Sequence, residues 1–181
     1  MKPIIPGEKL MQFARLNKIF ALLILIAIIN CAGPYKGRLI DEKSGAPIQG
    51  VVAVGYWTYM TPNVGGGTTH CLDARETVSD ENGNFAIPKS YYGEFFGEMS
   101  VAIYKVGYAK VTCLWESLNS PGGCLLEETE WEGDRAIIPM KRVVKTNLKW
   151  DGRPPDVSCG RKDGKPLSNY SREYEEFRQA L

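Results

Sequence analysis

The hydrophobic residues of this chain follow two different patterns along the sequence. An unbroken apolar run extends from Ile19 to Ile29. From Tyr35 onward the apolar residues come in short bursts separated by turn-forming residues, which is typical of short β-strands. Helical spacing returns only in roughly the last fifteen positions, at Tyr170, Tyr174, Phe177 and Leu181. The pattern predicts an apolar N-terminal helix, an all-β body and a short C-terminal helix.

The β-type bursts are numerous enough for a two-layer fold. Seven strands in about 110 residues match the size and spacing of a β-sandwich. The expected strands are Tyr35–Asp41, Val51–Trp57, Arg75–Ser79, Asn84–Pro88, Met99–Val106, Tyr108–Leu114 and Arg135–Val144. Between them, the step Asn82-Gly83 predicts a tight hairpin turn, and Thr58 to Thr69, with three consecutive glycines, predicts a long flexible loop. Alternation predicts the core positions Ile48, Val52, Val54, Val78, Phe85, Ile87, Val101 and Ile103.

The N-terminal apolar run has the length of a secretory signal. It follows the basic residues Arg15 and Lys18 and ends just before Cys31. A bilayer-spanning helix needs roughly 18 apolar residues, whereas this run has about ten. The order predicts a signal peptide over residues 1–30, with an uncleaved anchor or simple secretion as alternatives. A translation start at Met11 instead of Met1 would give a leader of more ordinary length.

The residues before Cys31 resemble a lipoprotein signal. Ile28-Ile29-Asn30-Cys31 is similar to the bacterial lipobox, although lipoproteins usually have Gly, Ala or Ser where this chain has Asn30. The resemblance implies cleavage before Cys31, acylation (palmitate among the acyl groups) at that residue, and residues 31–34 as a lipidated N-terminus. In Gram-negative cells, Ala32 in place of Asp after the cysteine implies transfer to the outer membrane. The expected location is therefore the periplasmic face of that membrane.

The cysteine count fits this picture. The chain has five cysteines, and lipidation of Cys31 leaves four for two disulfides, with three possible connectivities. Cys113 and Cys124 bracket a loop containing Gly and Pro, which favours their pairing and leaves Cys71 for Cys159. Buried free thiols are the alternative. Zinc binding is disfavoured because no Cys-x-x-Cys spacing occurs.

Charge argues against a role in nucleic-acid binding. The formal net charge of the whole chain is +1, but the leader holds four basic residues and one acidic residue, so its removal leaves −2. A mildly acidic domain without a basic face has little means of neutralising phosphates. The expected partners are the membrane, through a lipid anchor at Cys31, and envelope proteins or glycans.

Three segments together resemble the carboxypeptidase regulatory-like domain, which has a transthyretin-like β-sandwich. They are Gly37-Arg38-Leu39-Ile40-Asp41 with Ser44 to Val51, Thr77 to Pro88, and Ile103-Tyr104-Lys105-Val106-Gly107-Tyr108. The resemblance covers residues 35–144 and implies a seven-stranded sandwich of transthyretin-like or immunoglobulin-like type. In that family the domain is an accessory module, so the resemblance implies no peptidase activity.

The sequence offers little catalytic chemistry. Its single histidine, His70, adjoins Cys71, but neighbouring side chains on an extended segment point to opposite faces. No Gly-x-Ser-x-Gly elbow and no His-Glu-x-x-His motif occurs. We therefore expect neither enzymatic activity nor a metal or cofactor. An envelope hydrolase that uses carboxylates remains an alternative, with the candidate residues Asp73, Glu76, Asp80 and Glu81.

Aromatic residues are the best candidates for a binding surface. Exposed rings beside polar groups stack on sugars or contact partner proteins. The residues chosen for such a surface are Trp57, Tyr59, Tyr91 and Tyr92. The alternative is that these rings close the ends of a small sandwich. A carbohydrate- or peptidoglycan-binding module is therefore the second functional hypothesis, beside a non-catalytic binding or structural role.

The C-terminal residues 145–181 are predicted to form a polar tail. Pro154-Pro155 and Pro166 prevent regular structure until about Ser168, where the short amphipathic helix begins. The apolar stripe of this helix is expected to dock on its own domain, with docking on a partner as the alternative. A disulfide at Cys159 would tether the tail to the sandwich.

Overall fold

The computed structural model describes residues 34–115, 118, 129–143, 154–157 and 159–180. The chain divides into two units, Met1–Gly33 and Pro34–Leu181, and every described residue belongs to the second. The predicted leader, Cys31 and Cys124 therefore lie outside the described residues. Among the helices of the described ranges, none has both the length and the apolar character needed to cross a bilayer.

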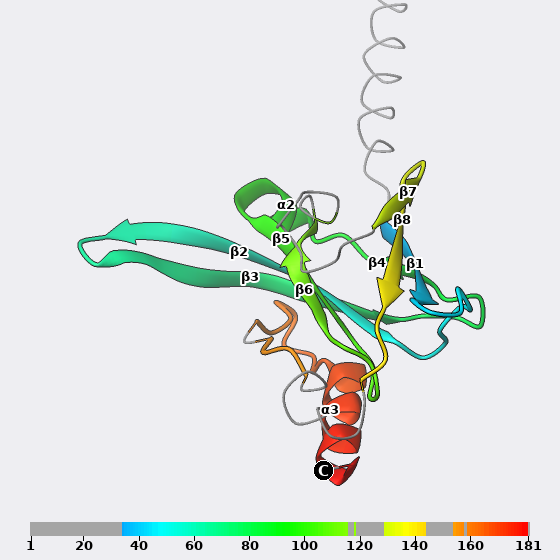
Figure 1. Cartoon of the computed structure of the whole chain (residues 1–181). Coiled ribbons are helices and arrows are strands. Elements are labelled where there is room, and N and C mark those ends of the chain that lie inside the picture. Colours follow the sequence, from blue (N-terminus) through cyan, green and yellow to red (C-terminus); the bar gives the residue numbers. More distant parts are fainter. Residues whose placement is uncertain (1–33, 116–117, 119–128, 144–153, 158, 181) are drawn as a thin grey trace, which may run out of the picture. The chain divides into compact units, whose positions relative to one another are not determined.

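The described residues form two four-stranded sheets, as expected for an all-β sandwich (Figure 1). The first sheet has the order β4-β1-β8-β7 and the second the order β3-β2-β5-β6. The strands are β1 Tyr35–Asp41, β2 Val52–Asn63, β3 Gly66–Val78, β4 Asn84–Ile87, β5 Glu98–Tyr104, β6 Val111–Leu114, β7 Glu130–Glu132 and β8 Arg135–Met140. The prediction of an all-β sandwich is confirmed, with eight strands in the described part instead of seven.

The main core lies between the two sheets. Leu39 of β1 and Ile138 of β8 are register partners in a parallel pair, and both are fully buried. They pack in one cluster with Val101 and Ile103, which alternate along β5 in the opposite sheet. Of the eight predicted core residues, seven are buried and Val78 is partly buried. Ile48, Phe85, Ile87, Val101 and Ile103 pack between the sheets, whereas Val52, Val54 and Val78 lie on the other face of the second sheet. The alternating pattern thus identified buried positions but assigned β2 to the wrong face.

Turn chemistry fixes the hairpin before β4. Gly83 has φ +76°, and a Cβ at this position would lie 2.4 Å from the backbone oxygen of Leu39. The carboxylate of Asp80 accepts hydrogen bonds from the backbone N–H groups of Asn82 and Asn84, at 2.9 and 2.8 Å. Glycine and an Asx-type turn together supply the tight reversal predicted at this place.

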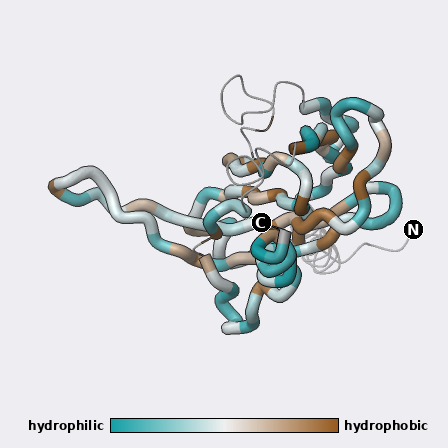
Figure 2. Tube along the Cα trace, turned by 60° about the horizontal axis from the view of Figure 1, so that its bottom comes forward, coloured by the Kyte–Doolittle hydropathy of each residue, from teal (hydrophilic) through white to brown (hydrophobic). Residues whose placement is uncertain are grey.

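The predicted flexible loop from Thr58 to Thr69 is wrong. This stretch continues β2 and β3 into a long paired arm that ends at Asn63 and Gly66 (Figure 1). β2 pairs with β5 only as far as Thr58, where a register shift interrupts its pairing with β3. The arm is mostly of intermediate or low hydropathy with a hydrophobic tip, whereas most strongly apolar positions lie in the sandwich (Figure 2). Gly65 lies in the turn, whereas Gly66 and Gly67 belong to β3 and pair with β2.

Three further elements differ from prediction. The expected strand from Tyr108 to Leu114 begins only at Val111, because Gly107 takes φ +88° in a turn and Tyr108 makes only an isolated bridge to Arg142. A short helix, α2 (Tyr91–Phe96), follows β4, and the strand β7 was not foreseen. Both unforeseen elements are six residues long or shorter, too short for a periodic pattern to identify.

A third layer covers the outer face of the second sheet. It consists of the C-terminal residues around Cys159 and the helix α3 (Ser168–Ala180). Val52 and Val54 of β2 face this layer, together with Val157, Leu167 and Tyr170 of the tail. Both faces of β2 are covered in this region, which explains why its first four residues are all buried. The predicted docking of the C-terminal helix on its own domain is confirmed.

Candidate functional site

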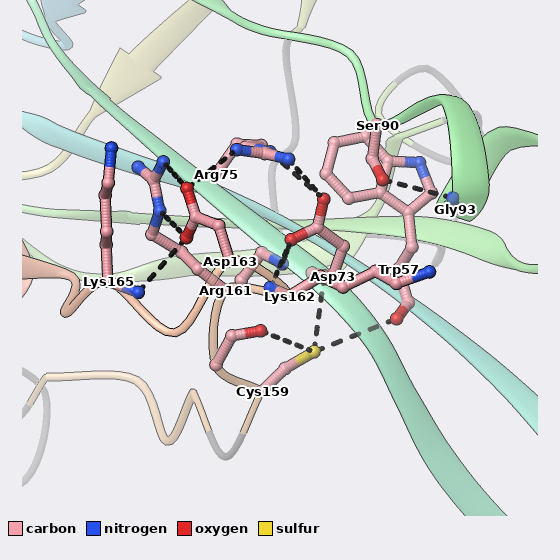
Figure 3. Close-up of polar contacts among 12 residues, drawn as sticks. Trp57, Asp73, Arg75, Ser90, Gly93, Cys159, Arg161, Lys162, Asp163 and Lys165 are labelled. Atoms are coloured by element: carbon pink, nitrogen blue, oxygen red, sulfur yellow. Dashed lines mark hydrogen bonds and ion pairs between the residues drawn. The ribbon is translucent and has the colours of Figure 1, made fainter.

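A buried carboxylate joins the tail to the second sheet. The side chain of Asp73 on β3 is 1% exposed and points toward the tail (Figure 3). Its Oδ1 accepts the backbone N–H groups of Lys162 at 2.8 Å and Ala74 at 2.9 Å. Its Oδ2 accepts Nε of Arg75 at 3.0 Å and a second guanidinium nitrogen at 2.9 Å. The Ser90 side chain is a further hydrogen-bond partner. These hydrogen bonds satisfy the carboxylate, so its burial is compensated.

These contacts determine how Asp73 titrates. Burial by itself would raise the pKa of the Asp73 carboxyl, because it penalises the charged form. The hydrogen bonds from Lys162 and Ser90 and the positive charge of Arg75 outweigh burial, so the pKa lies below its usual value. Asp73 is therefore a carboxylate at neutral pH with its acceptor positions occupied. A general base instead needs a free lone pair directed at a substrate.

The disulfide beside Asp73 is the one predicted. Cys71 and Cys159 are bonded, with their Cα atoms 5.3 Å apart. The Cys159 sulfur also lies 3.3 Å from the backbone oxygen of Asp73. Because Cys71 is oxidised, it cannot serve as a nucleophile. The second predicted pair involves Cys124, which lies outside the described residues.

His70 has partners away from Cys71. Its ring stacks on Tyr59, with centroids 4.8 Å apart, and its Nε2 lies 2.8 Å from the hydroxyl oxygen of Thr61. All three residues belong to the arm formed by β2 and β3. The histidine is therefore part of a cross-strand cluster on the arm.

Glu76 positions the start of α3. One of its carboxylate oxygens accepts the backbone N–H of Asn169 at 3.2 Å, and the other accepts that of Tyr170 at 3.0 Å. The first N–H groups of a helix lack partners within the helix, and a carboxylate there also interacts favourably with the helix dipole. Glu76 thus caps α3 from the neighbouring strand. With Asp80 in its turn, the carboxylates considered for a hydrolase are separately engaged, and Glu81 is exposed.

The second candidate region is the surface of α2. Ser90 caps this helix, and its hydroxyl oxygen accepts the backbone N–H of Gly93 at 3.1 Å. Four aromatic side chains of the helix face solvent, and we call them the α2 aromatic face. They are Tyr91 (83% exposed), Tyr92 (47%), Phe95 (82%) and Phe96 (62%). Large rings exposed side by side on one short helix indicate an interaction surface.

Gly93 sets the distance between α2 and the core. A Cβ built on Gly93 would lie 2.3 Å from Cγ of Trp57, which is closer than real atoms approach. We expect Gly93→Ala to push α2 outward and lower the free energy of unfolding by about 1–3 kcal/mol, as overpacking does. Urea denaturation followed by tryptophan fluorescence measures the change. Tyr91→Ala on the exposed side of the same helix is the control, and an unchanged midpoint for Gly93→Ala would contradict this packing.

The four residues predicted as a binding surface do not lie together. Trp57 is only 1% exposed and packs in the main core, so its assignment to a binding surface is corrected. Its position in β2 turns the ring inward, between the two sheets. Tyr59 lies on the arm, and Tyr91 and Tyr92 belong to α2. Phe95 and Phe96 were not chosen, although the run Tyr91 to Phe96 following a Ser N-cap was a readable signal.

A column of aromatic rings connects α2 with the start of β1. The Tyr35 ring lies 6.2 Å from the Trp57 ring and 5.3 Å from the Trp115 ring, and Trp115 lies 5.9 Å from Trp131. The Tyr35 hydroxyl donates a hydrogen bond of 2.7 Å to Oε1 of Glu94 in α2. The first residue of β1 therefore contacts α2, the helix that carries the α2 aromatic face.

Metal and pocket geometry add no further candidate. Within the described ranges, no group of three or more His, Cys, Asp or Glu side chains is arranged to hold a metal ion. A shallow pocket of about 300 Å³ is lined by Lys36, Asp80 and Arg135, among others. Lys36 is paired with Asp134 at 2.8 Å, and Asp80 is occupied by its turn. This pocket presents no convergent set of free polar groups.

Comparisons with protein-family models, with curated proteins and with solved structures found no match to this chain. The resemblance to the carboxypeptidase regulatory-like domain therefore stays a prediction from three sequence segments. The site itself consists of two parts: a tail clamp made by Asp73, Glu76 and the Cys71–Cys159 disulfide, and the α2 aromatic face.

Proposed function

We propose that this protein is a bacterial envelope lipoprotein, in which a non-catalytic β-sandwich is held on a membrane by acyl chains at Cys31. The observation that carries the proposal is the order of basic residues, apolar run and cysteine immediately before the sandwich. Pro34 begins the compact second unit, three positions after Cys31. An acylated Cys31 would thus hold the folded domain directly at the lipid surface, on the periplasmic face of the outer membrane.

The disulfide supports a location outside the cytoplasm. Disulfides persist in oxidising compartments such as the periplasm and are rare in the cytosol. The Cys71–Cys159 bond connects β3 with the tail that packs on the second sheet through Val157, Leu167 and Tyr170. A tail held in this way suits a protein that works where thiols are oxidised.

The arrangement of the polar groups supports a binding or structural role. Cys71 is in a disulfide, Asp73 has its hydrogen-bonding positions filled, and Glu76 caps a helix. These were the side chains of the sequence that came nearest to a catalytic set. The features left over for interaction are aromatic and exposed, as in surfaces that bind and do not react.

The anchor is tested by replacing Cys31 in the full chain expressed in a Gram-negative host. We expect Cys31→Ser to lose both the acyl mass measured on the intact protein and retention in the membrane fraction. Ala32→Asp is the matched control, which should keep the acyl mass but shift the protein from the outer to the inner membrane. A wild-type protein that is soluble and unacylated would overturn the proposal. Membrane retention of both variants without acyl mass would show an uncleaved anchor instead.

A further inference from the structure

We propose that the α2 aromatic face inserts into the headgroup region of the membrane that holds the protein. The inference rests on the proposed function, because it takes the anchor at Cys31 as given. It adds a second membrane contact, made by the folded domain itself. The α2 aromatic face thus binds a lipid surface, and not a partner protein.

The length of chain between anchor and sandwich limits where α2 can be. Four residue steps separate Cys31 from Tyr35, and even a fully extended chain covers only about 14 Å over that distance. Tyr35 hydrogen-bonds to Glu94 in the middle of α2, at 2.7 Å. An acylated cysteine holds its own backbone at the lipid surface. The end of the sandwich that carries α2 is therefore confined to the vicinity of the headgroups.

The chemistry of the face suits this environment. Tyrosine rings, apolar with one polar tip, are enriched at membrane interfaces, and phenylalanine supplies apolar area on interfacial helices. The most exposed rings, Tyr91 and Phe95, lie four positions apart on α2, and side chains with this spacing share a helix face. Trp131, another ring typical of interfaces, is 36% exposed and joins the same column of rings through Trp115. Several amphipathic rings therefore gather at the end where the chain enters.

Charge near the helix neither attracts nor repels an anionic membrane strongly. Lys89 and Lys162 balance Glu94 and Glu98 around α2. Lys89 is paired with Glu94 at 3.2 Å, and the Lys162 ammonium lies 3.1 Å from the centroid of the Tyr92 ring. Insertion would therefore depend on aromatic burial and change little with salt, in contrast to a basic surface helix.

α2 is too short to bind in the groove of a partner protein. Helices that bind in grooves use anchor residues at positions i, i+3, i+4 and i+7. α2 has six residues and so cannot present the last of these. A short helix of rings can instead lie in the plane of an interface, where each side chain partitions by itself.

The test places a tryptophan on the face of the full-length acylated protein. The protein is reconstituted in vesicles made mostly of phosphatidylethanolamine with a minority of phosphatidylglycerol, with or without a lipid brominated near the glycerol end of its acyl chains. The emission added by Phe95→Trp is obtained by subtracting the wild-type spectrum. We expect this added emission to shift to the blue and to be quenched about twofold by the brominated lipid, at low and high salt alike.

Val64→Trp is the matched control, since Val64 is fully exposed at the tip of the arm. Its added emission should be unquenched. Vesicle flotation of both variants reports the anchor separately. Floating protein in which position 95 is quenched no more than position 64 would overturn the inference and leave the anchor intact. A blue shift without quenching would also overturn it, because α2 would then be covered by protein. Failure to float would refute the proposed function and this inference together.

Discussion

Replacing both Cys71 and Cys159 by serine is expected to lower the free energy of unfolding by about 2–5 kcal/mol. The two cysteines are 88 residues apart, so the bond closes a long loop and strongly restricts the unfolded chain. Cys159 is also 4% exposed, and a serine there would bury a hydroxyl in a cluster with Val52, Val54 and Ala102. Urea denaturation of the purified full-length protein measures the difference.

The same substitution at Cys31 is the control for the disulfide variant. Cys31 precedes the compact unit, so Cys31→Ser should leave the denaturation midpoint of the sandwich unchanged. Native hydrogen exchange should show faster exchange in α3 of the double variant, because the tail would open without the bond. A double variant with unchanged stability would show that noncovalent contacts alone hold the tail.

Asp73→Ala is expected to lower the free energy of unfolding by about 2–4 kcal/mol. The substitution removes a carboxylate that is 1% exposed, leaves the N–H of Lys162 without its acceptor, and leaves Arg75 only the longer ion pair with Asp163, at 3.8 Å. The figure is below the usual cost of breaking a fully buried pair, because Arg75 is 26% exposed and keeps part of its hydration. Asp134→Ala, at a 74% exposed carboxylate paired with Lys36, is the control and should change the stability far less, because solvent screens the exposed pair.

The pH dependence of the Asp73 variants gives a second readout. The pKa of Asp73 is lower in the folded protein than in the unfolded chain. Its contribution is therefore present above the unfolded value of about 4 and is lost as the pH falls through the folded value. The difference in stability between wild type and Asp73→Asn should shrink as the pH drops below about 4. A difference that stays constant into acid would contradict a role for the carboxylate charge.

Two components of the tail clamp, Asp73 and the Cys71–Cys159 disulfide, should act together. Cys159 and Lys162 lie three positions apart on one tail segment, which docks through both the disulfide and Asp73. Once the tail has opened, removing Asp73 costs less. Removing the disulfide and Asp73 together should therefore lower the free energy of unfolding by less than the sum of the two separate losses.

Much of the sandwich could be predicted from local sequence. Val101 and Ile103 alternate with less apolar neighbours, and that alternation alone identifies an inward face. The Asn82-Gly83 step identified its turn, because positive φ is a local demand that glycine meets at little cost. The pairing of Cys71 with Cys159 followed from assigning Cys113 to the nearby Cys124.

The arm and the site were harder to predict for a physical reason. Three glycines between Thr58 and Thr69 read locally as flexibility, but strand pairing over Thr58 to Asn63 outweighs the low strand preference of glycine. Trp57 next to Tyr59 read as an aromatic surface, yet the strand period turns the Trp57 ring inward, where it is buried. The sequence left Asp73 as a candidate hydrolase carboxylate, because its partner Lys162 lies 89 positions later in the chain and no local pattern shows the contact.

The sequence by itself determined the all-β class, most of the buried strand positions, the turn at Gly83 and the cysteine that pairs with Cys71, because these depend on residue type and on near neighbours. Only the tertiary structure decided that the tail forms a third layer, that Asp73 is a filled acceptor and that α2 exposes its rings beside Tyr35. Each of these depends on which distant segments come into contact. A hydrophobic pattern predicts which residues are buried, but it does not predict which segment packs against them.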